Sequence, residues 1–333
     1  MASDIARILE MVNGYQETCI VVAALQLGVL DKLAAKPSTA EALATEVGAD
    51  PVALGRLLRA LRVLHLVDGA DEVSVTPTGK LLLEKGFGAG IRAWALLVGG
   101  EYLAAWGQLA HSVKTGDVAF DKVFGMSAWE HRAQHPDLNA SFNRVTTGEQ
   151  LRAIEGVLRA YDFTGRGCIV DVGGGHGNLV AGILKKYPAA RGIVFDQPHV
   201  VEGAPAALES AGVAARCEVV GGSFLESVPA GGDTYVLKHV LHNWSDADCV
   251  TILRHCQAAM PTDGRLLVLE NVIPDDPTTA RALVMLDLHM MAVLGGRERT
   301  RGEYAALLRD AGLQFSKLIP TREGAPDVIE ATR

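Results

Sequence analysis

Residues 237–246, which read LKHVLHNWSD, place proton-transfer side chains directly after a short apolar run. His239 and His242 are three residues apart, and Lys238 stands four residues before the second histidine. Histidine suits a general base because its ordinary pKa lies close to neutral pH. His242 lies beyond the apolar run at 235–237, where ligands dock, whereas His239 is expected within the strand and packed in the fold. The alternative is an ordinary turn between a strand and a helix.

A glycine-rich loop at 171–178, DVGGGHGN, follows one apolar run and precedes a helical pattern. Glycines let a ligand approach the backbone without a side chain in the way. The dinucleotide fingerprint G-x-G-x-x-G fails, because Asn178 takes its last place when counting starts at Gly173. Asp196 ends the next apolar run, where a carboxylate can accept hydrogen bonds from both ribose hydroxyls. The pattern indicates a nucleoside site without pyrophosphate; the alternative is a tight turn in which Asp196 caps a helix.

From about residue 166 the chain alternates between apolar runs and helical patterns. Such alternation predicts a parallel sheet with helices on both faces, which binds its ligand at the carboxyl ends of the strands. The expected strands are at 167–172, 191–196, 217–222, 234–240 and 265–271, and the expected helices at 177–188, 198–208 and 246–260.

Residues 1 to about 85 have the pattern of a small helical module. The run 20–35 is apolar nearly all round, which suits a helix buried against other helices or another subunit. Two capped helices at 38–50 and 50–67, a turn, and the alternating strand 73–76 complete a winged helix-turn-helix pattern. Helices are expected to continue from 86 to about 165.

The winged-helix pattern raises the hypothesis of DNA binding. Arg56, Arg59 and Arg62 are spaced to form one stripe on the second helix. The chain nevertheless carries a net charge of −8, which repels nucleic acid and acidic membranes. We therefore expect a packing and dimerisation module, with no nucleic-acid or membrane partner.

The composition is that of a globular protein. Apolar residues make up 49% of the chain and charged residues 21%. A chain of 333 residues is longer than one compact core usually spans, so two domains are expected. The five cysteines contain no C-x-x-C pair, which indicates reduced thiols, and the N-terminus lacks a secretory pattern. The apolar stretch 282–294 is too short to span a bilayer, so we expect a cytoplasmic protein. No metal is expected, because no carboxylate–histidine spacing accompanies His239, His242 and His289.

Five motifs follow one another in order: IVDVGGGHG at 169–177, FDQPHV at 195–200, GGSF at 221–224, LKHVLHNWSD at 237–246 and GGRERT at 295–300. Together they resemble the S-adenosylmethionine-dependent O-methyltransferases of small hydroxylated aromatics, which include plant caffeic acid and flavonoid enzymes and bacterial enzymes of antibiotic pathways. The resemblance implies an α/β fold: a Rossmann-like class I methyltransferase domain at 101–333 with a mostly parallel seven-stranded sheet. It also implies a winged-helix dimerisation domain at 1–100, a homodimer, and a helical segment at 101–165 that contributes to the acceptor pocket.

By this resemblance the chain is expected to transfer a methyl group from S-adenosylmethionine to a phenolic hydroxyl in secondary metabolism. The expected cofactor contacts are Gly173 and Gly175 in the loop, Asp196 at the ribose, Gly222, Ser223 and Phe224 beside the adenine, and Lys238. Many relatives have aspartate where this chain has Ser223, so this side chain would bond there as a neutral group.

The resemblance further implies that His242 is the base, with Glu270 and Glu298 beside it. A carboxylate that accepts the imidazole N–H would fix its tautomer and stabilise the imidazolium. The expected acceptor pocket comprises Trp129, Phe142, Asn143, Val145, His289, Met290 and Met291.

Two other functions stay open. One is a family relative that uses the same cofactor for non-methylating, hydroxylase-like chemistry; the relative of this kind lacks the base histidine and the glutamate of GGRERT, which this chain keeps. The other is a winged-helix DNA-binding regulator, which only the arginine stripe supports.

Overall fold

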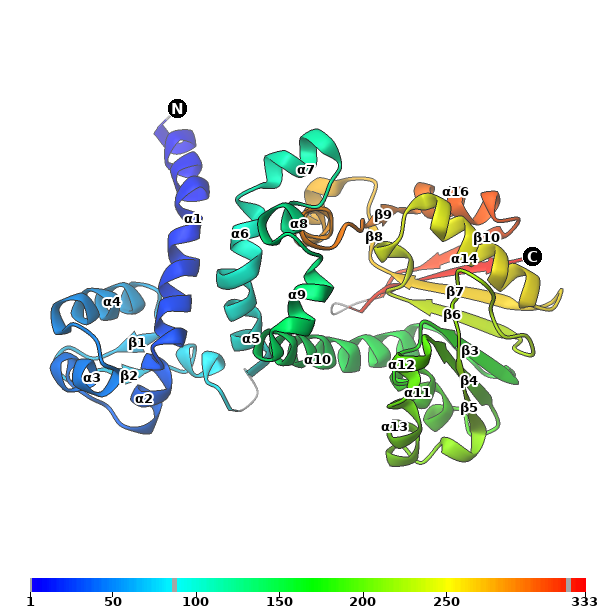
Figure 1. Cartoon of the computed structure of the whole chain (residues 1–333), viewed down its shortest axis with the longest axis horizontal. Helices are drawn as coiled ribbons and strands as arrows, with labels where there is room; N and C mark the ends of the chain where they lie inside the picture. The colour runs from blue at the N-terminus through cyan, green and yellow to red at the C-terminus, as the bar shows by residue number, and fades with distance from the viewer. Residues whose placement is uncertain (1, 86–88, 322–324) are drawn as a thin grey trace. The chain divides into compact units, whose positions relative to one another are not determined.

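The computed structural model describes residues 2–85, 89–321 and 325–333, without the side chains of 2, 143–144 and 146–152. The chain forms two compact units (Figure 1). The first comprises residues 1–110 and 119–148, and the second comprises 111–118 and 149–333. The boundary at residue 100 between a dimerisation and a catalytic domain stays a prediction.

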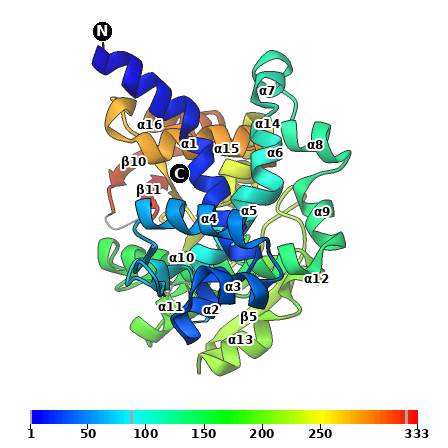
Figure 2. The same ribbon diagram turned by 90° about the vertical axis from the view of Figure 1, so that its left-hand side faces the viewer.

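The N-terminal part of the first unit is a winged helix-turn-helix, as its pattern predicts. Thr39 and Asp50 cap their helices through their side chains, and Pro51 occupies the first turn. The predicted helix at 20–35 is wrong in one respect: Gly28 adopts a left-handed backbone and divides it in two. The elements, which share one apolar cluster, are α1 (Ala2–Gln26), α2 (Val29–Ala35), α3 (Ala40–Val47), α4 (Pro51–Val63), β1 (Val67–Asp68), β2 (Ser74–Val75) and η1 (Gly79–Leu82) (Figure 2).

Further helices follow, as expected for this part of the chain, and all but the last are short. They are α5 (Ala89–Leu97), the π-helical turn η2 (Val98–Tyr102), α6 (Leu103–Trp106), α7 (Leu109–Thr115), α8 (Ala119–Phe124), α9 (Ala128–Gln134) and α10 (Pro136–Ala160). Arg132 and Glu101 form a buried ion pair at 2.9 Å within the first unit.

The second unit contains a seven-stranded sheet in the order β10-β11-β7-β6-β3-β4-β5. The five strands from β7 to β5 in this order are parallel, and β11 runs antiparallel to both of its neighbours. The five strands read from the sequence are confirmed, but the closing hairpin was expected only through the resemblance. The strands are β3 (Cys168–Val172), β4 (Arg191–Asp196), β5 (Cys217–Gly221), β6 (Thr234–Lys238), β7 (Arg265–Glu270), β10 (Gln314–Ile319) and β11 (Asp327–Thr332).

Helices cover both faces of this sheet (Figure 1). Side chains of successive strand residues point to opposite faces, so Val236 and Leu237 belong to two different apolar clusters. The predicted helix at 198–208 is two short helices, and the other two helices read from the sequence are confirmed. The covering helices are α11 (Asn178–Lys186), α12 (Pro198–Val201), α13 (Ala204–Ser210), α14 (Asp246–Ala259) and α16 (Arg301–Asp310).

The segment between β7 and α16 contains two short strands that form a second small sheet. Strands β8 (Val272–Ile273) and β9 (Arg299–Thr300) pair in parallel, and helix α15 (Arg281–His289) and the π-helical turn η6 (Met290–Leu294) lie between them in sequence.

Within the described residues, no single helix has the length and apolarity needed to cross a membrane. The bent pair formed by 3–26 and 29–35, at 57°, meets that criterion only when both helices are taken together.

Candidate active site

The order of the sheet strands locates the site. Strand β3 lies in the middle, the chain then adds β4 and β5 on one side, and β6 begins the other side. Open α/β sheets bind ligands where this change of direction leaves a crevice at the carboxyl ends of the strands. The glycine loop follows β3, and the turn that carries His242 follows β6. Both segments singled out in the sequence therefore flank the same crevice.

The glycine loop has a backbone that needs glycine. Gly173, Gly175 and Gly177 have φ values of 74°, 57° and 78°, in the left-handed region. An ideal Cβ at Gly173 would lie 2.7 Å from Cγ2 of Val240, which belongs to the segment after β6. A side chain at Gly173 would thus collide with Val240.

Asp196 lies beside this loop, as its position at the end of β4 predicts. Its Oδ2 accepts the backbone N–H of Gly175 at 2.9 Å, and its Oδ1 accepts that of Gln197 at 2.7 Å. Each carboxylate oxygen keeps a further lone pair for a ligand hydroxyl. The loop and the carboxylate therefore fit a nucleoside, and the alternative of a simple helix cap is weakened because Asp196 binds the loop itself.

The remaining cofactor candidates come from the ends of β5 and β6. The backbone N–H of Gly222 donates to the carbonyl of Asp196 at 2.9 Å. The ring of Phe224 lies 3.7 Å from the ideal Cβ position of Gly173, so it borders the loop. Ser223 Oγ accepts the N–H of Leu225 at 3.3 Å. Their contacts with a cofactor stay predictions.

Strand β6 is shorter than the sequence predicted, so both histidines lie in the turn that follows it. Strand β6 ends at Lys238, and His239 has a left-handed backbone with φ 52°, so its predicted place within the strand is wrong. Such a backbone is uncommon for a residue other than glycine, and it turns the chain sharply. His242 then lies in the single 3-10 turn η4 (Leu241–Asn243). The two imidazole rings are stacked at 5.4 Å between centroids.

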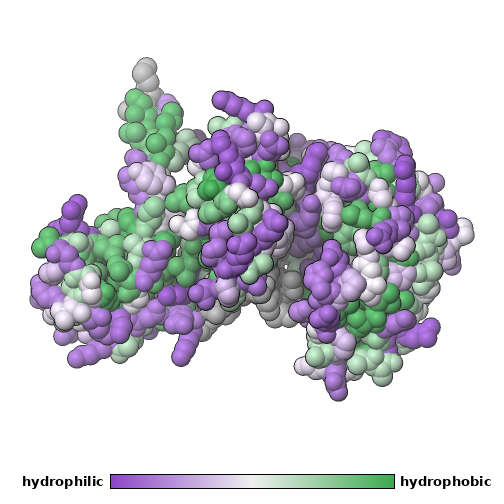
Figure 3. Space-filling view, in the orientation of Figure 1, coloured by the Kyte–Doolittle hydropathy of each residue, from purple (hydrophilic) through white to green (hydrophobic). Residues whose placement is uncertain are grey.

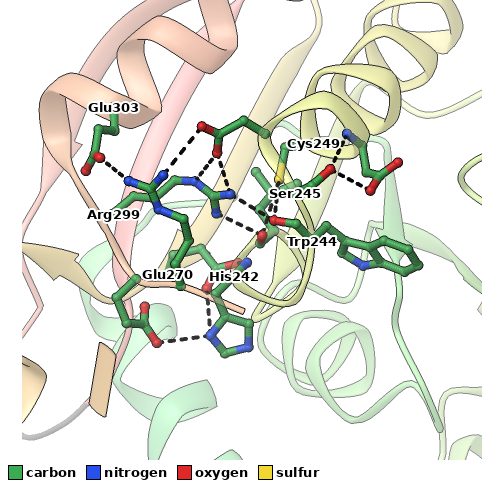
Figure 4. A network of polar contacts seen from close by, with 12 residues as sticks. His242, Trp244, Ser245, Cys249, Glu270, Arg299 and Glu303 are labelled. Carbon is green, nitrogen blue, oxygen red and sulfur yellow. Dashed lines mark hydrogen bonds and ion pairs between the residues drawn. The ribbon is translucent and has the colours of Figure 1, made fainter. Parts of the chain in front are cut away.

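His242 meets the two glutamates that the resemblance nominated. Its Nδ1 lies 3.1 Å from Oε1 of Glu298 and 3.6 Å from Oε2 of Glu270, and its backbone N–H donates to Oε1 of Glu270 at 3.3 Å (Figure 4). Both glutamate side chains are fully buried, whereas His242 is 14% exposed. A carboxylate at Nδ1 holds the proton there and leaves Nε2 as the basic nitrogen.

Burial and charge act against each other at these groups. Burial lowers the pKa of His242, but the charges of Glu270 and Glu298 outweigh it and raise that pKa above 6.5, against a smaller opposing effect of Lys238. Burial raises the pKa of Glu270 to about 7, although His242 opposes the rise. Burial also lowers the pKa of Lys238 and, more strongly, that of His239. His242 is the base candidate because Glu270 and Glu298 lie beside its ring and favour its protonated form.

The segment before β9 reaches the His242 turn by close backbone contact. An ideal Cβ at Gly296 would lie 2.1 Å from the carbonyl oxygen of His242, so only glycine fits there. The next residue, Arg297, donates its backbone N–H to that carbonyl at 2.8 Å. Glu298 is held in turn by Asp287 of α15, whose Oδ1 accepts its N–H at 2.9 Å.

Sequence reasoning missed two residues of this arrangement. Asp287 and Arg299 were given no role from the sequence. Arg299 is fully buried and bonds the turn of His242. The glycine pair and alternating charges of GGRERT were the available signal.

The predicted acceptor residues fall in both units. Trp129 and Phe142 of the first unit form an edge-to-face pair at 5.6 Å between ring centroids. In the second unit Met290 is buried, and its Cε lies 3.0 Å from the ideal Cβ position of Gly296, beside the His242 turn. Val145 belongs to the first unit and His289 and Met291 to the second, and the side chain of Asn143 lies outside the described residues. The acceptor pocket stays a prediction.

One group in the described part of the chain has the donors for a metal ion. The ligand atoms of His242, Glu270 and Glu298 lie within 4.8 Å of one another. The hydrogen bond at Nδ1 gives these side chains a role without metal, and we expect that EDTA leaves turnover unchanged. Loss of activity on dialysis against EDTA, with recovery on adding one divalent metal, would contradict the predicted absence of a metal.

The strand order, with a nucleoside crevice at its switch point and a final antiparallel hairpin, defines a class I methyltransferase. Comparison with known families narrows this class. An O-methyltransferase domain matches residues 106–314, and an O-methyltransferase dimerisation domain matches residues 9–85. The chain belongs to the O-methyltransferase family and is an S-adenosylmethionine-dependent enzyme.

Individual relatives agree over nearly the full length. The chain is 38% identical to the phenazine O-methyltransferase PhzM of Lysobacter antibioticus, over 97% of this chain and 95% of the relative. It superposes on the structure of the mitomycin 7-O-methyltransferase MmcR with a TM-score of 0.89 and 35% identity, over 100% of this chain and 98% of the other. It also superposes on NcsB1, solved with S-adenosylmethionine and 2-hydroxy-5-methyl naphthoic acid, with a TM-score of 0.81, 34% identity and 95% of each chain.

These comparisons confirm the resemblance, the fold class and the cofactor. They give no support to hydroxylase-like chemistry or to a DNA-binding regulator.

Proposed function

We propose that this enzyme methylates a hydroxyl group of a flat aromatic metabolite, with His242 as the general base. The observation that carries the proposal is the contact of His242 Nδ1 with two buried glutamates, at the crevice that the glycine loop also borders. The names of the relatives support an aromatic acceptor, since they act on or bind phenazines and naphthoates.

The reaction needs a proton acceptor. A phenol with a pKa of about 10 is mostly protonated at neutral pH. His242 accepts that proton at Nε2 while its Nδ1–H donates to Glu298, and the two carboxylates stabilise the imidazolium that forms.

The cofactor carries the methyl group on a sulfonium sulfur, and the rest of the cofactor leaves as a neutral thioether when the methyl group is transferred. The chain's own task is then to hold the acceptor oxygen in line and to remove its proton. We assign the cofactor to Gly173, Gly175, Asp196, Gly222, Ser223, Phe224 and Lys238, because these residues end or follow parallel strands at the same edge of the sheet.

Incubation with S-adenosylmethionine and a panel of phenols, naphthoates, hydroxyphenazines and aromatic polyketides tests the proposal. The expected result is a mass gain of one methyl group on at least one class, with fragmentation that places it on oxygen. The O-methyl ethers of the same compounds are the matched controls and should not gain mass. Methylation of amines alone would contradict the assignment of the acceptor atom.

Asp196→Asn is expected to weaken S-adenosylmethionine binding by at least roughly 10-fold, because hydrogen bonds to a carboxylate are stronger than those to an amide. Calorimetric titration of the purified variant measures this. Asp162→Asn is the control, since Asp162 caps a loop elsewhere through bonds to Thr164. Unaltered cofactor affinity in Asp196→Asn would remove the ribose assignment.

We also propose that the enzyme is a homodimer through its N-terminal domain. The family's dimerisation domain at 9–85 supports this, and so does an apolar face on α1. Six large apolar side chains there are 54–65% exposed at helical spacing: Ile5, Ile8, Leu9, Met11, Val12 and Tyr15 (Figure 3).

Light scattering at micromolar concentration is expected to give twice the chain mass for the wild type. Ile8→Asp with Val12→Asp should give a monomer, because each places a charge in an apolar interface. Val63→Asp is the control, since Val63 is an isolated exposed residue on α4. A wild-type monomer would refute the proposal. The predicted cytoplasmic location also remains a proposal, supported by the five cysteines, which are all free thiols.

A further inference from the structure

A buried guanidinium links the base turn to the segment that carries its carboxylate. Arg299 follows Glu298 directly, and its side chain is 0% exposed. Its Nη1 donates to the carbonyl of Leu241 at 2.9 Å, and its Nη2 donates to the carbonyl of Trp244 at 2.9 Å (Figure 4). These two carbonyls stand on either side of His242, so the guanidinium spans the turn that presents the base.

The guanidinium of Arg299 also binds a carboxylate outside the turn. Its Nε and Nη2 donate to Oδ1 of Asp246 at 3.0 and 2.7 Å. Asp246 is the first residue of α14, so it fixes the guanidinium against the start of that helix. Arginine has a planar fork of five donors and can hold one carboxylate and two carbonyls together, whereas the ammonium of lysine is a single point.

The position of the turn decides whether His242 meets Glu298. The Nδ1–Oε1 distance is 3.1 Å, and a hydrogen bond is lost within about half an ångström beyond that. Glu298 and Arg299 are adjacent in the chain, so a bond from Arg299 to the turn fixes the turn relative to the carboxylate.

We propose that Arg299 is a positioning residue for methyl transfer, which acts by holding the His242 turn against Glu298, with Asp246 as its outer anchor. This rests on the proposed role of His242 as base. Arg299 itself touches no reacting group; it sets the place of a side chain that does.

Arg299→Lys is expected to lower kcat by about 10-fold, because small displacements of a catalytic group are costly. The KM for the acceptor and the Kd for S-adenosylmethionine should change less than about twofold, since no binding group is removed. The acid limb of the kcat/KM profile should move to lower pH, because His242 loses its contact with the carboxylate that raises its pKa. Arg254→Lys is the control: Arg254 donates to the carbonyl of Asp310, away from the turn.

Three further measurements separate positioning from a merely structural role. Millimolar guanidinium should restore part of the activity of Arg299→Ala, and an equal concentration of ethylammonium should not. Asp246→Asn should shift the acid limb in the same direction by a smaller amount, and it serves if Arg299→Ala does not fold. In a His242→Ala background, Arg299→Lys should cause no further loss, because a residue that acts through the base has nothing left to position.

Unchanged kcat in Arg299→Lys would overturn the proposal, and so would an equal loss with and without His242. If His242→Ala alone keeps full turnover, the base assignment fails instead, so the two failures are distinguishable.

Discussion

His242→Ala is expected to lower the chemical step by roughly 10²–10⁴-fold, because a positioned base contributes that much to proton removal. Binding of S-adenosylmethionine should survive, since the cofactor candidates lie on the glycine loop and at the ends of β4, β5 and β6 and do not include His242. Single-turnover kinetics measure the chemical step, and calorimetry measures the cofactor affinity. The residual rate should rise steeply with pH, as the acceptor phenol then loses its proton to hydroxide.

A matched control is His65→Ala. His65 is exposed in the first unit and contributes nothing to the proposed site. Its backbone is left-handed, like that of His239, so alanine at position 65 must adopt this conformation. Its turnover should equal that of the wild type. If His242→Ala retained the wild-type rate at neutral pH, the proton would have to leave by another route and the base assignment would be lost.

Glu298→Gln is expected to lower kcat by about 10- to 100-fold and to move the acid limb of the kcat/KM profile to lower pH. His242 must be neutral to accept a proton, so activity rises as pH passes upward through its pKa. The charges of Glu270 and Glu298 hold that pKa above 6.5 despite burial. Removing one of them lowers the pKa, which places the limb lower, while the imidazolium formed during transfer is less stabilised at every pH.

The loss should be smaller than that of His242→Ala, because Glu270 still lies 3.6 Å from Nδ1. Glu155→Gln, at an exposed ion pair on α10, is the control for loss of a glutamate charge and should leave the profile in place. A limb that stays where it is in Glu298→Gln would mean that this carboxylate does not set the basicity of His242.

The parts of the fold that were predictable are those in which local pattern and tertiary position coincide. Strand β3, its glycine loop and Asp196 could be placed because apolar runs, glycines and a strand-end acid follow one another at short range. The break at Gly28 was missed because both helices are apolar, and composition does not record where the backbone turns. Strand β10 gives a weak pattern, because all of its side chains are half-buried or exposed.

The site was predictable to the extent that it lies in motifs. His242 was chosen over His239 because His239 was expected within the strand, but the structure places both histidines after β6, with a sharp turn at His239 and stacked rings that could not be foreseen. Arg299 was missed because its bonds are made to backbone carbonyls, which every residue carries and no sequence marks. The acceptor residues proposed from the resemblance belong to two different units of the chain, so no local pattern links them and the pocket stays a prediction.

The contacts of Arg297, Glu298 and Arg299 limit how this enzyme can diversify. Three successive residues contact the turn that carries His242: the first through its backbone N–H, the second through its carboxylate and the third through its guanidinium. Insertion or deletion of one residue between Gly296 and Thr300 would shift each group to the place of its neighbour. We therefore expect the length of this short segment to be inherited unaltered, while side chains elsewhere in the enzyme can be exchanged without moving these three groups.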